Sequence, residues 1–173
     1  LNAVQERNWE YEEIKILDSS NVNEIAFVQS VQINSEYVLG DFCEFKFGIK
    51  VYQVGKGKPR QTREDVSNKI FDADYKVNDD YLPILRARDV QRFFIREPKL
   101  FIKYGQHLAE PRDITLFQGE RILLQRIIAD KLNACYTKDT YLCNTDVITI
   151  KPKNEVNVLA LAGILASKLF IKH

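Results

Sequence analysis

Glycine and proline divide this chain into short apolar segments, and this punctuation constrains its fold more than any other feature of the sequence. Gly55-Lys56-Gly57-Lys58-Pro59 interrupts one apolar stretch, Pro98 and Gly105 enclose another, and Pro152 ends a third. Such breaks favour short strands joined by loops over long helices. The 173 residues, 45% of them hydrophobic, suffice to bury the core of one ordinary globular domain. We therefore expect a single domain over residues 1–173.

Most of the apolar segments are predicted to be strands. Aromatic and branched residues near a period of two indicate a strand over residues 42–51. Residues 100–102, 121–128 and 141–150 are predicted to be further strands of a central sheet. Pro152 would end the last of them, because proline cannot donate to a strand ladder.

Two helices are predicted beside these strands. Asn21 or Asn23 would cap a helix that runs to about Ile33. Residues 156–171 would form the other helix, with its apolar face made of Leu159, Ala162, Leu165 and Leu169. The polar loop that opens at Gly55 is expected to continue through Asp65. The predicted fold is α+β, with a mixed, twisted sheet, basic loops and a C-terminal helix.

Basic charge is concentrated in two blocks of a chain whose net charge is only +1. Residues 46–69 carry seven basic and two acidic groups, and residues 86–131 carry ten basic and six acidic groups. Residues 1–45, by contrast, carry two basic and nine acidic groups. A neutral protein with such segregated charge can present a positive face to a polyanion. On composition alone, a solvated surface of mixed charges is the better interpretation.

The cysteines and histidines do not have the spacing of a metal site. Cys43, Cys135 and Cys143 contain no C-x-x-C pair, and the only histidines are His107 and His173. We therefore expect free thiols in the core, no bound metal and a reducing compartment. Neither a signal peptide nor an apolar run of membrane-spanning length is present, so we expect a cytoplasmic protein with no membrane partner. Because the chain starts at Leu1 and contains no methionine, we expect it to be a piece of a longer polypeptide.

Motifs for catalysis are mostly missing from the sequence. Gly55 and Gly57 form only a fragment of a dinucleotide fingerprint, and no phosphate-binding loop of the G-x-x-x-x-G-K-[ST] type occurs. Asp113 and Glu120 flank an apolar stretch and could hold Mg²⁺ in a nuclease. However, Ile122 stands where such an enzyme needs a lysine, and a surface turn explains both acids more simply. We expect no catalytic residue in this chain, and a Mg²⁺-dependent nuclease half-domain is kept as an alternative.

Five segments in fixed order carry a resemblance to a known family. Residues 81–93 contain Arg88-Asp89-Val90-Gln91-Arg92-Phe93, and residues 102–112 follow a YG-x-x-L-x-x-PR pattern from Tyr104 to Arg112. Residues 119–126, the pair formed by 39–41 and 48–49, and the final segment 163–169 complete the set. Together they resemble the TaqI-like specificity domain over about residues 38–170. The chain departs from the family pattern at Ala87, Phe93 and Ala166, where the family has glycine, tyrosine and asparagine.

The resemblance implies a function and a parent protein. It implies a target-recognition domain that binds double-stranded DNA in a bacterial restriction-modification system. The parent would be an adenine-specific DNA methyltransferase that uses S-adenosylmethionine, alone or fused to a restriction endonuclease. The Asn/Asp-Pro-Pro-Tyr/Phe motif of the methylase half is absent from this chain. The cofactor and the chemistry would therefore belong to a catalytic methyltransferase domain of the same polypeptide, which would be the partner of this domain.

The two basic blocks supply the candidate DNA-binding residues. Lysine and arginine neutralise phosphates, and arginine, lysine and glutamine read base edges in the major groove. The first block offers Lys56, Lys58, Arg60, Gln61 and Arg63 on a Gly/Pro frame, and the second offers Arg86, Arg88, Arg92, Lys103 and Arg126. For Arg88 and Arg92 we expect a structural ion pair with Asp89. A protein-interaction module that uses the acidic N-terminal region stays as a third possibility.

Overall fold

The computed structural model describes residues 36–127, 132–153 and 156–167. Contacts within the chain divide it into two compact units, Leu1–Asp41 and Phe42–His173. The predicted helix over residues 21–33 lies outside the described residues, and the expectation of one domain over the whole chain stays a prediction. All the strands among the described residues belong to the second unit.

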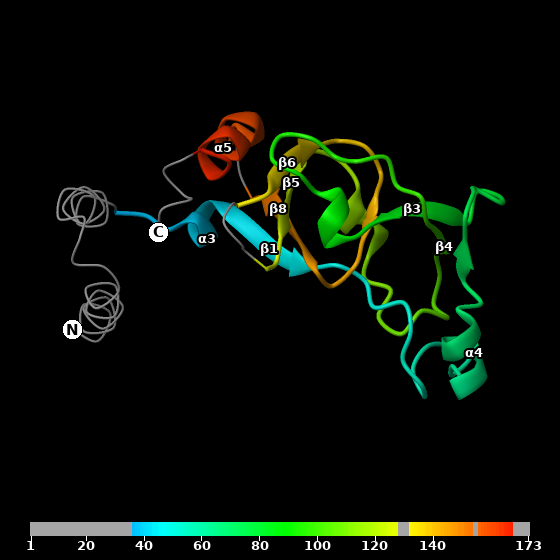
Figure 1. The fold of residues 1–173 in the computed structure, drawn as a ribbon. Coiled ribbons are helices and arrows are strands. Elements are labelled where there is room, and N and C mark those ends of the chain that lie inside the picture. Colours follow the sequence, from blue (N-terminus) through cyan, green and yellow to red (C-terminus); the bar gives the residue numbers. More distant parts are fainter. Residues whose placement is uncertain (1–35, 128–131, 154–155, 168–173) are drawn as a thin grey trace, which may run out of the picture. The chain divides into compact units, whose positions relative to one another are not determined.

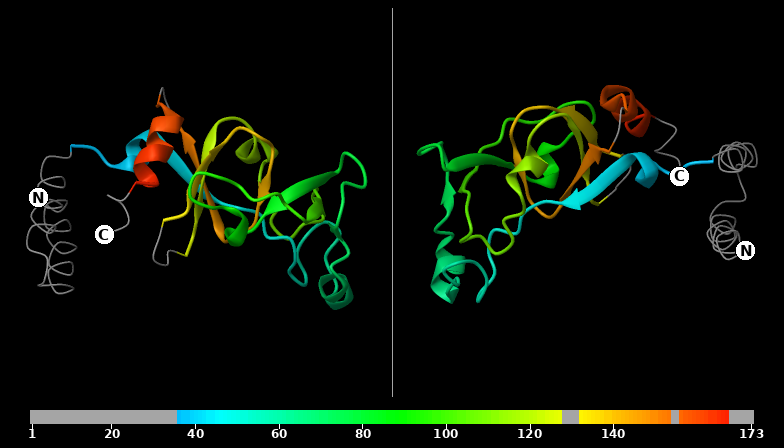
Figure 2. Two further views of the ribbon diagram at one scale, coloured as in Figure 1. Left: turned by 45° about the horizontal axis from the view of Figure 1, so that its top comes forward. Right: turned by 180° about the vertical axis from the view of Figure 1, so that it is seen from behind.

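The first sheet contains four antiparallel strands in the order β1-β8-β5-β6 (Figure 1). They are β1 (Cys43–Phe47), β8 (Val147–Pro152), β5 (Arg121–Gln125) and β6 (Ala134–Thr137). Phe45 pairs with Ile150, which in turn pairs with Ile122. β1 therefore joins a strand from the far end of the sequence, and Figure 2 shows the two side by side. The predicted strands at 42–51 and 121–128 are confirmed in shorter form.

The second sheet contains β2 (Asp72–Ala73), β4 (Phe101–Lys103), β3 (Tyr81–Leu85) and β7 (Leu142–Cys143), in the order β2-β4-β3-β7. β3 and β7 run parallel, whereas the other pairs are antiparallel, so the predicted mixed α+β fold is confirmed. The prediction of one central sheet is wrong. The expected strand over residues 141–150 is broken at Asn144, which accepts a hydrogen bond from the Val147 N–H (3.1 Å) and bonds the Asp146 carboxylate (2.9 Å). This turn sends β7 and β8 into different sheets.

The helices of the described part are short. They are α3 (Leu39–Phe42), α4 (Arg63–Asn68) and α5 (Val158–Leu165), with 3-10 turns at η1 (Ala87–Asp89) and η2 (Ile114–Phe117). α4 corrects the prediction that the polar loop continues through Asp65. Thr62 caps this helix: its hydroxyl accepts from the Asp65 N–H (3.1 Å), and the Asp65 carboxylate accepts from the Thr62 N–H (2.7 Å). Such a reciprocal pair starts a helix even within a polar segment.

α5 confirms the predicted C-terminal helix and the burial of Ala162 and Leu165, but Leu159 does not belong to its buried face. Val158, Ala162 and Leu165 are buried against β6 and β5, whereas Leu159 is 64% exposed. Asn157 caps the helix by accepting from the Ala160 N–H (2.9 Å). The i, i+4, i+7 spacing of the buried residues therefore starts one residue earlier than predicted. Leu169 lies outside the described residues.

One apolar core joins the two sheets. Ile84 and Leu85 of β3 pack in one cluster with Leu123 of β5 and Val147 of β8. The three cysteines are buried and unpaired, which confirms the prediction of core thiols. Burial raises the pKa of Cys143 to about 12, so this thiol is protonated at neutral pH. Within the described ranges, no helix has the length and apolar character needed to cross a bilayer.

Candidate nucleic-acid interface

Residues 53–62 form the last part of the connection between β1 and α4. They make a tightly hydrogen-bonded loop that we call the basic loop. The Gly55 N–H donates to the Gln61 carbonyl (2.9 Å), and the Gln61 N–H donates to the Lys56 carbonyl (2.8 Å). Gly55 and Gly57 have φ angles of +80° and +85°. Glycine adopts such angles without the steric cost that other residues meet. The two glycines therefore allow a compact loop with a fixed course.

Gln61 holds the basic loop together from inside. Its side-chain amide donates to the Val51 and His107 carbonyls and accepts from the Gln53 N–H, each at 2.8 Å. The residue is only 3% exposed. The prediction of Gln61 as a DNA-binding residue is therefore wrong, because a buried and fully bonded amide has nothing left to offer a base. Its position among lysines and arginines in the sequence had indicated a surface residue.

The family-like segment from Tyr104 to Arg112 forms the support on which the basic loop rests. The Lys58 N–H donates to the Gln106 carbonyl (2.8 Å). A Cβ atom added at Gly57 would lie 2.2 Å from the His107 carbonyl oxygen, so only glycine allows this approach. The His107 ring packs against Phe71 at 4.3 Å between ring centroids. This segment therefore acts as a structural support for the basic loop.

Four cations of the first basic block point into solvent. Lys56, Lys58 and Arg60 of the basic loop are exposed, and so is Arg63, which is the first residue of α4. Within the described part of the chain, none of the four side chains makes a hydrogen bond or an ion pair. The structure therefore brings the predicted cations of this block together on a rigid support and leaves them free.

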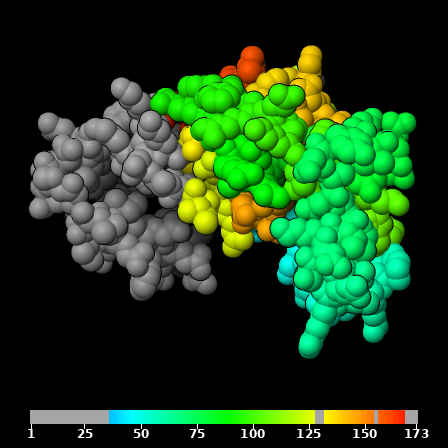
Figure 3. All heavy atoms as spheres, turned by 45° about the vertical axis from the view of Figure 1, so that its right-hand side comes forward, coloured from blue at the N-terminus to red at the C-terminus, as the bar shows by residue number. Residues whose placement is uncertain are grey.

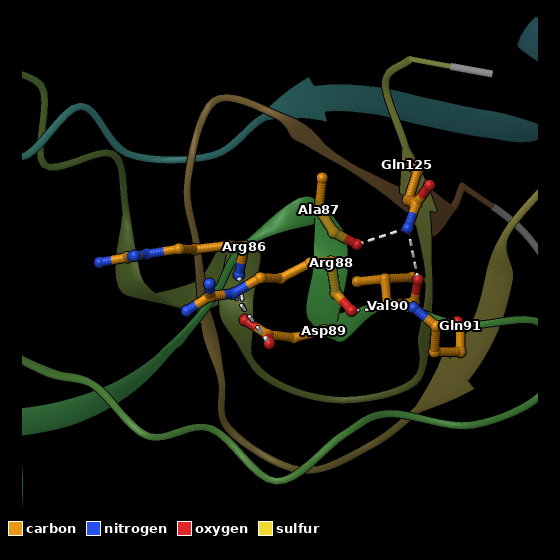
Figure 4. A network of polar contacts seen from close by, with 7 residues as sticks. All are labelled: Arg86, Ala87, Arg88, Asp89, Val90, Gln91 and Gln125. Atoms are coloured by element: carbon orange, nitrogen blue, oxygen red, sulfur yellow. Dashed lines mark hydrogen bonds and ion pairs between the residues drawn. The ribbon is translucent and has the colours of Figure 1, made fainter. Parts of the chain in front are cut away.

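In the second block, the turn from Arg86 to Asp89 is anchored on one side and charged on the other (Figure 4). The Gln125 amide donates to the Ala87 carbonyl (2.5 Å) and the Val90 carbonyl (2.8 Å). The Asp89 carboxylate accepts from the Arg86 N–H (2.9 Å) and lies 3.9 Å from the Arg88 Nε, so the expected Arg88 ion pair is present but long. The side chains of Arg86 and Arg88 extend away from Gln125, as Figure 4 shows.

The other predicted residues of the second block have different surroundings. The Arg92 Nε donates to the Ala166 carbonyl (2.6 Å), and its guanidinium lies 5.0 Å from the Phe93 ring centre. The expected Arg92–Asp89 ion pair does not form, because Arg92 instead ties the 90–95 segment to the end of α5. Arg126 is exposed but lies over the Phe47 ring at 5.1 Å, and Lys103 is exposed on β4. Arg92 is thus partly structural.

The carboxylates proposed for a nuclease are both engaged elsewhere. Asp113 caps η2 by accepting from the Thr115 hydroxyl (2.6 Å) and the Thr115 N–H (2.8 Å), and these bonds lower its pKa. Glu120 accepts from the Tyr136 hydroxyl (2.7 Å). No group of three potential ligands among His, Cys, Asp and Glu comes together in the ranges that the structure describes. The structure offers this alternative no support, and the acidic N-terminal segment of the third possibility lies mostly outside the described residues.

Folding also gathers basic residues that the sequence analysis missed. Arg96 and Lys99 line a surface hollow of about 510 Å³ together with Arg86 and Arg88. In the sequence, Glu97 stands between them and an apolar stretch precedes them, so they have the pattern of an ordinary solvated surface of mixed charges. Only the turn between Val90 and Ile95, which brings residues 96–99 back beside residues 86–89, reveals the group.

Comparisons with known proteins place this geometry in a family. The model of the TaqI-like C-terminal specificity domain matches residues 82–172. No curated protein sequence is a significant match. Two solved structures are similar over 97% of this chain. One is a chain from work on complex assembly and conformational transition of the type I R-M system, with 11% identity and a TM-score of 0.46. The other is the HsdS subunit from Thermoanaerobacter tengcongensis, with 12% identity and a TM-score of 0.42. The chain spans 40% of the length of each.

The family match includes most of the elements described above. It covers β3 from Leu82 onward, the turn at η1, the segment from Tyr104 to Arg112, the strands from β4 to β8, and α5, whereas α3, β1, α4 and β2 precede it. Because the match extends over more than half of the residues, this chain belongs to the TaqI-like C-terminal specificity domain family.

Proposed function

We propose that this chain recognises a specific sequence in double-stranded DNA, as the target-recognition domain of a bacterial restriction-modification protein. Membership of a specificity-domain family supports this function. The observation that carries the proposal is the basic loop, where Lys56, Lys58 and Arg60 are exposed and free on a support held by the buried amide of Gln61. Cations that the fold does not use are available to a polyanion.

The basic loop suits both parts of DNA recognition. Contacts from lysine and arginine to phosphates set affinity and register, and a few side chains read base edges in the major groove. The loop keeps its course without these cations, because its internal bonds come from backbone groups and Gln61. Members of a family that read different sequences can therefore vary such a loop while they keep the frame from Tyr104 to Arg112.

The parent protein is proposed to be an adenine-specific DNA methyltransferase, alone or fused to a restriction endonuclease. A methyltransferase must turn its target base out of the duplex and hold the DNA in place meanwhile, which costs a few kcal/mol. In this proposal the present domain supplies the grip and no catalytic residue. S-adenosylmethionine would bind to the catalytic domain of the same polypeptide. The buried free thiols are compatible with the reducing cytoplasm, where we place the protein.

Fluorescence anisotropy of the 173-residue chain with a labelled duplex tests the proposed function. We expect weak binding that falls steeply with salt, because phosphate contacts release condensed counterions. Lys58→Ala and Arg60→Ala should each weaken binding, and a lost phosphate contact should lower the salt slope by about one. Lys138→Ala is the matched control, since Lys138 is exposed on the connection between β6 and β7 and belongs to neither basic block.

Two results would count against this proposal. If both loop variants bind DNA as tightly as the Lys138→Ala control, the basic loop is not the DNA-binding surface. If calorimetry shows that the 173-residue chain binds S-adenosylmethionine, the assignment of the cofactor to a separate catalytic domain is wrong.

A further inference from the structure

A second basic site lies outside the basic loop, in the hollow lined by Arg86, Arg88, Arg96 and Lys99, which we call the arginine hollow. The hollow has a volume of about 510 Å³, and Asp74, Asp89 and Glu97 also line it. Residues 86–99, coloured green in Figure 3, form part of the face that is seen there. Cations from two stretches of sequence, 86–88 and 96–99, therefore converge on one concave surface.

The walls of the arginine hollow are fixed by hydrogen bonds of the backbone. The Arg96 N–H donates to the Asp89 carbonyl (2.8 Å), and the Ile84 N–H donates to the Leu100 carbonyl (3.0 Å). Val90 and Ile95 form an antiparallel bridge next to the first of these bonds, on the side of the 91–94 turn. The Gln125 amide holds the opposite side of the 86–89 turn, as described above. The cations are therefore carried on a support that is already in place before any ligand arrives.

The charges of the arginine hollow are not used by the fold. Within the described part of the chain, the side chains of Arg86, Arg96 and Lys99 make no hydrogen bond and no ion pair. Of the three carboxylates, only Asp89 is engaged, by the Arg86 N–H and by the long contact to Arg88. Three uncommitted cations, Arg86, Arg96 and Lys99, thus face two uncommitted carboxylates, Asp74 and Glu97. Positive charge gathered in a concave surface attracts anions more strongly than the same charge spread over a convex one.

We propose that the arginine hollow binds the sugar-phosphate backbone of the DNA, with Arg96 and Lys99 as phosphate-binding residues beside Arg86 and Arg88. This inference rests on the proposed function and adds a second contact surface to it. A hollow receives the convex ridge of a DNA strand, whereas base edges lie at the floor of the major groove and are reached by protruding elements. A second hollow of about 580 Å³ has Asp74, Glu97 and Lys99 in common with the arginine hollow and extends to Lys76. It continues the surface along which a DNA strand could lie.

The proposal predicts both losses and gains of DNA affinity, because the arginine hollow contains free carboxylates, Asp74 and Glu97, as well as cations. Each phosphate contact releases about 0.9 counterion, so its loss lowers affinity about eightfold at 0.1 M salt and lowers the salt slope by about one. We expect this result for Arg96→Ala and for Lys99→Ala. Asp74→Asn and Glu97→Gln remove a negative charge from the same surface, and they should tighten binding. Urea unfolding of all four variants should match the unaltered chain, because the changed side chains make no hydrogen bond or ion pair with the described residues.

Anisotropy titrations of the 173-residue chain, with Lys138→Ala as the neutral control, separate the outcomes. If the unaltered chain binds no duplex at all, the proposed function and this inference are both wrong. If Lys58→Ala and Arg60→Ala weaken binding while Arg96→Ala and Lys99→Ala match the control, only the arginine hollow is wrong. If Glu97→Gln weakens binding to a GC-rich duplex but not to an AT-rich one, the hollow reads bases and the phosphate assignment is overturned.

Discussion

The basic loop and the second basic block use their charged residues in opposite ways. In the basic loop, a neutral side chain, Gln61, makes the structural bonds, and the cations around it are left free. In the second block, arginine has both roles: the Arg92 Nε donates to the Ala166 carbonyl, while the half-buried Arg86 extends from an anchored turn, away from Gln125. The number of basic residues in a segment therefore does not tell how many of them face DNA. A basic residue is available to DNA where another group, such as the Gln61 or Gln125 amide, makes the hydrogen bonds that hold the local backbone.

The largest effect that separates frame from DNA contacts is expected at Gly57. Gly57→Ala meets the steric cost of a positive φ and also places its Cβ against the His107 carbonyl, so it should lower the free energy of unfolding by about 3 kcal/mol. Gly55→Ala is the matched control, because it has a similar φ with open space around it, and should cost about 1 kcal/mol. Equal urea midpoints for the two variants would show that the basic loop does not rest on the Tyr104–Arg112 segment.

A smaller loss is expected when the buried amide is replaced. Gln61→Leu keeps the volume but leaves the Val51 and His107 carbonyls and the Gln53 N–H without their partner, which should cost about 2 kcal/mol. Gln106→Leu changes an exposed amide in the neighbouring segment and should leave stability within about 0.5 kcal/mol. Urea unfolding gives both values. An unchanged midpoint for Gln61→Leu would restore Gln61 as a candidate for DNA contact.

The smallest expected change in stability is the difference between alanine substitutions of two arginines in the second block, Arg92 and Arg88. Arg92→Ala removes the bond to Ala166 and the contact with the Phe93 ring, and should cost about 1 kcal/mol of stability. Arg88→Ala removes an exposed side chain with one long ion pair, and should cost less than about 0.5 kcal/mol. DNA affinity should show the reverse order, with the greater loss for Arg88→Ala. If both variants lose the same stability and the same affinity, the two roles are not divided between these residues.

The strands were easier to predict than the turns that connect them. Alternating aromatic and branched residues predicted β1, and apolar runs predicted β4 and β5, because strand patterns are local. The Asn144 turn was missed, since it interrupts an apolar run without glycine or proline. α4 was missed because the hydrophobic pattern is weak in six residues, although Thr62 and Asp65 form a recognisable cap.

The sequence predicted the candidate site only where residues that are adjacent in the sequence form it. The exposed cations of the basic loop stand together in the sequence, and the structure keeps them together. Gln61 was assigned to the surface because burial of an amide depends on the Tyr104–Arg112 segment, which is distant in the sequence. Arg96 and Lys99 were passed over for the same reason, since their meeting with Arg86 depends on the fold-back between Val90 and Ile95.

The position of β1 has a consequence for the way in which related proteins could trade specificities. Every residue of β1 pairs with β8, from Cys43 opposite Pro152 to Phe47 opposite Ile148, although β1 precedes residue 82, where the family match begins. A recombination event with its crossover at residue 82 would give the new domain a foreign first strand or an uncovered β8. An uncovered strand edge is a site of aggregation. Productive crossovers should therefore fall before Phe42, so that β1 and β8 are inherited together.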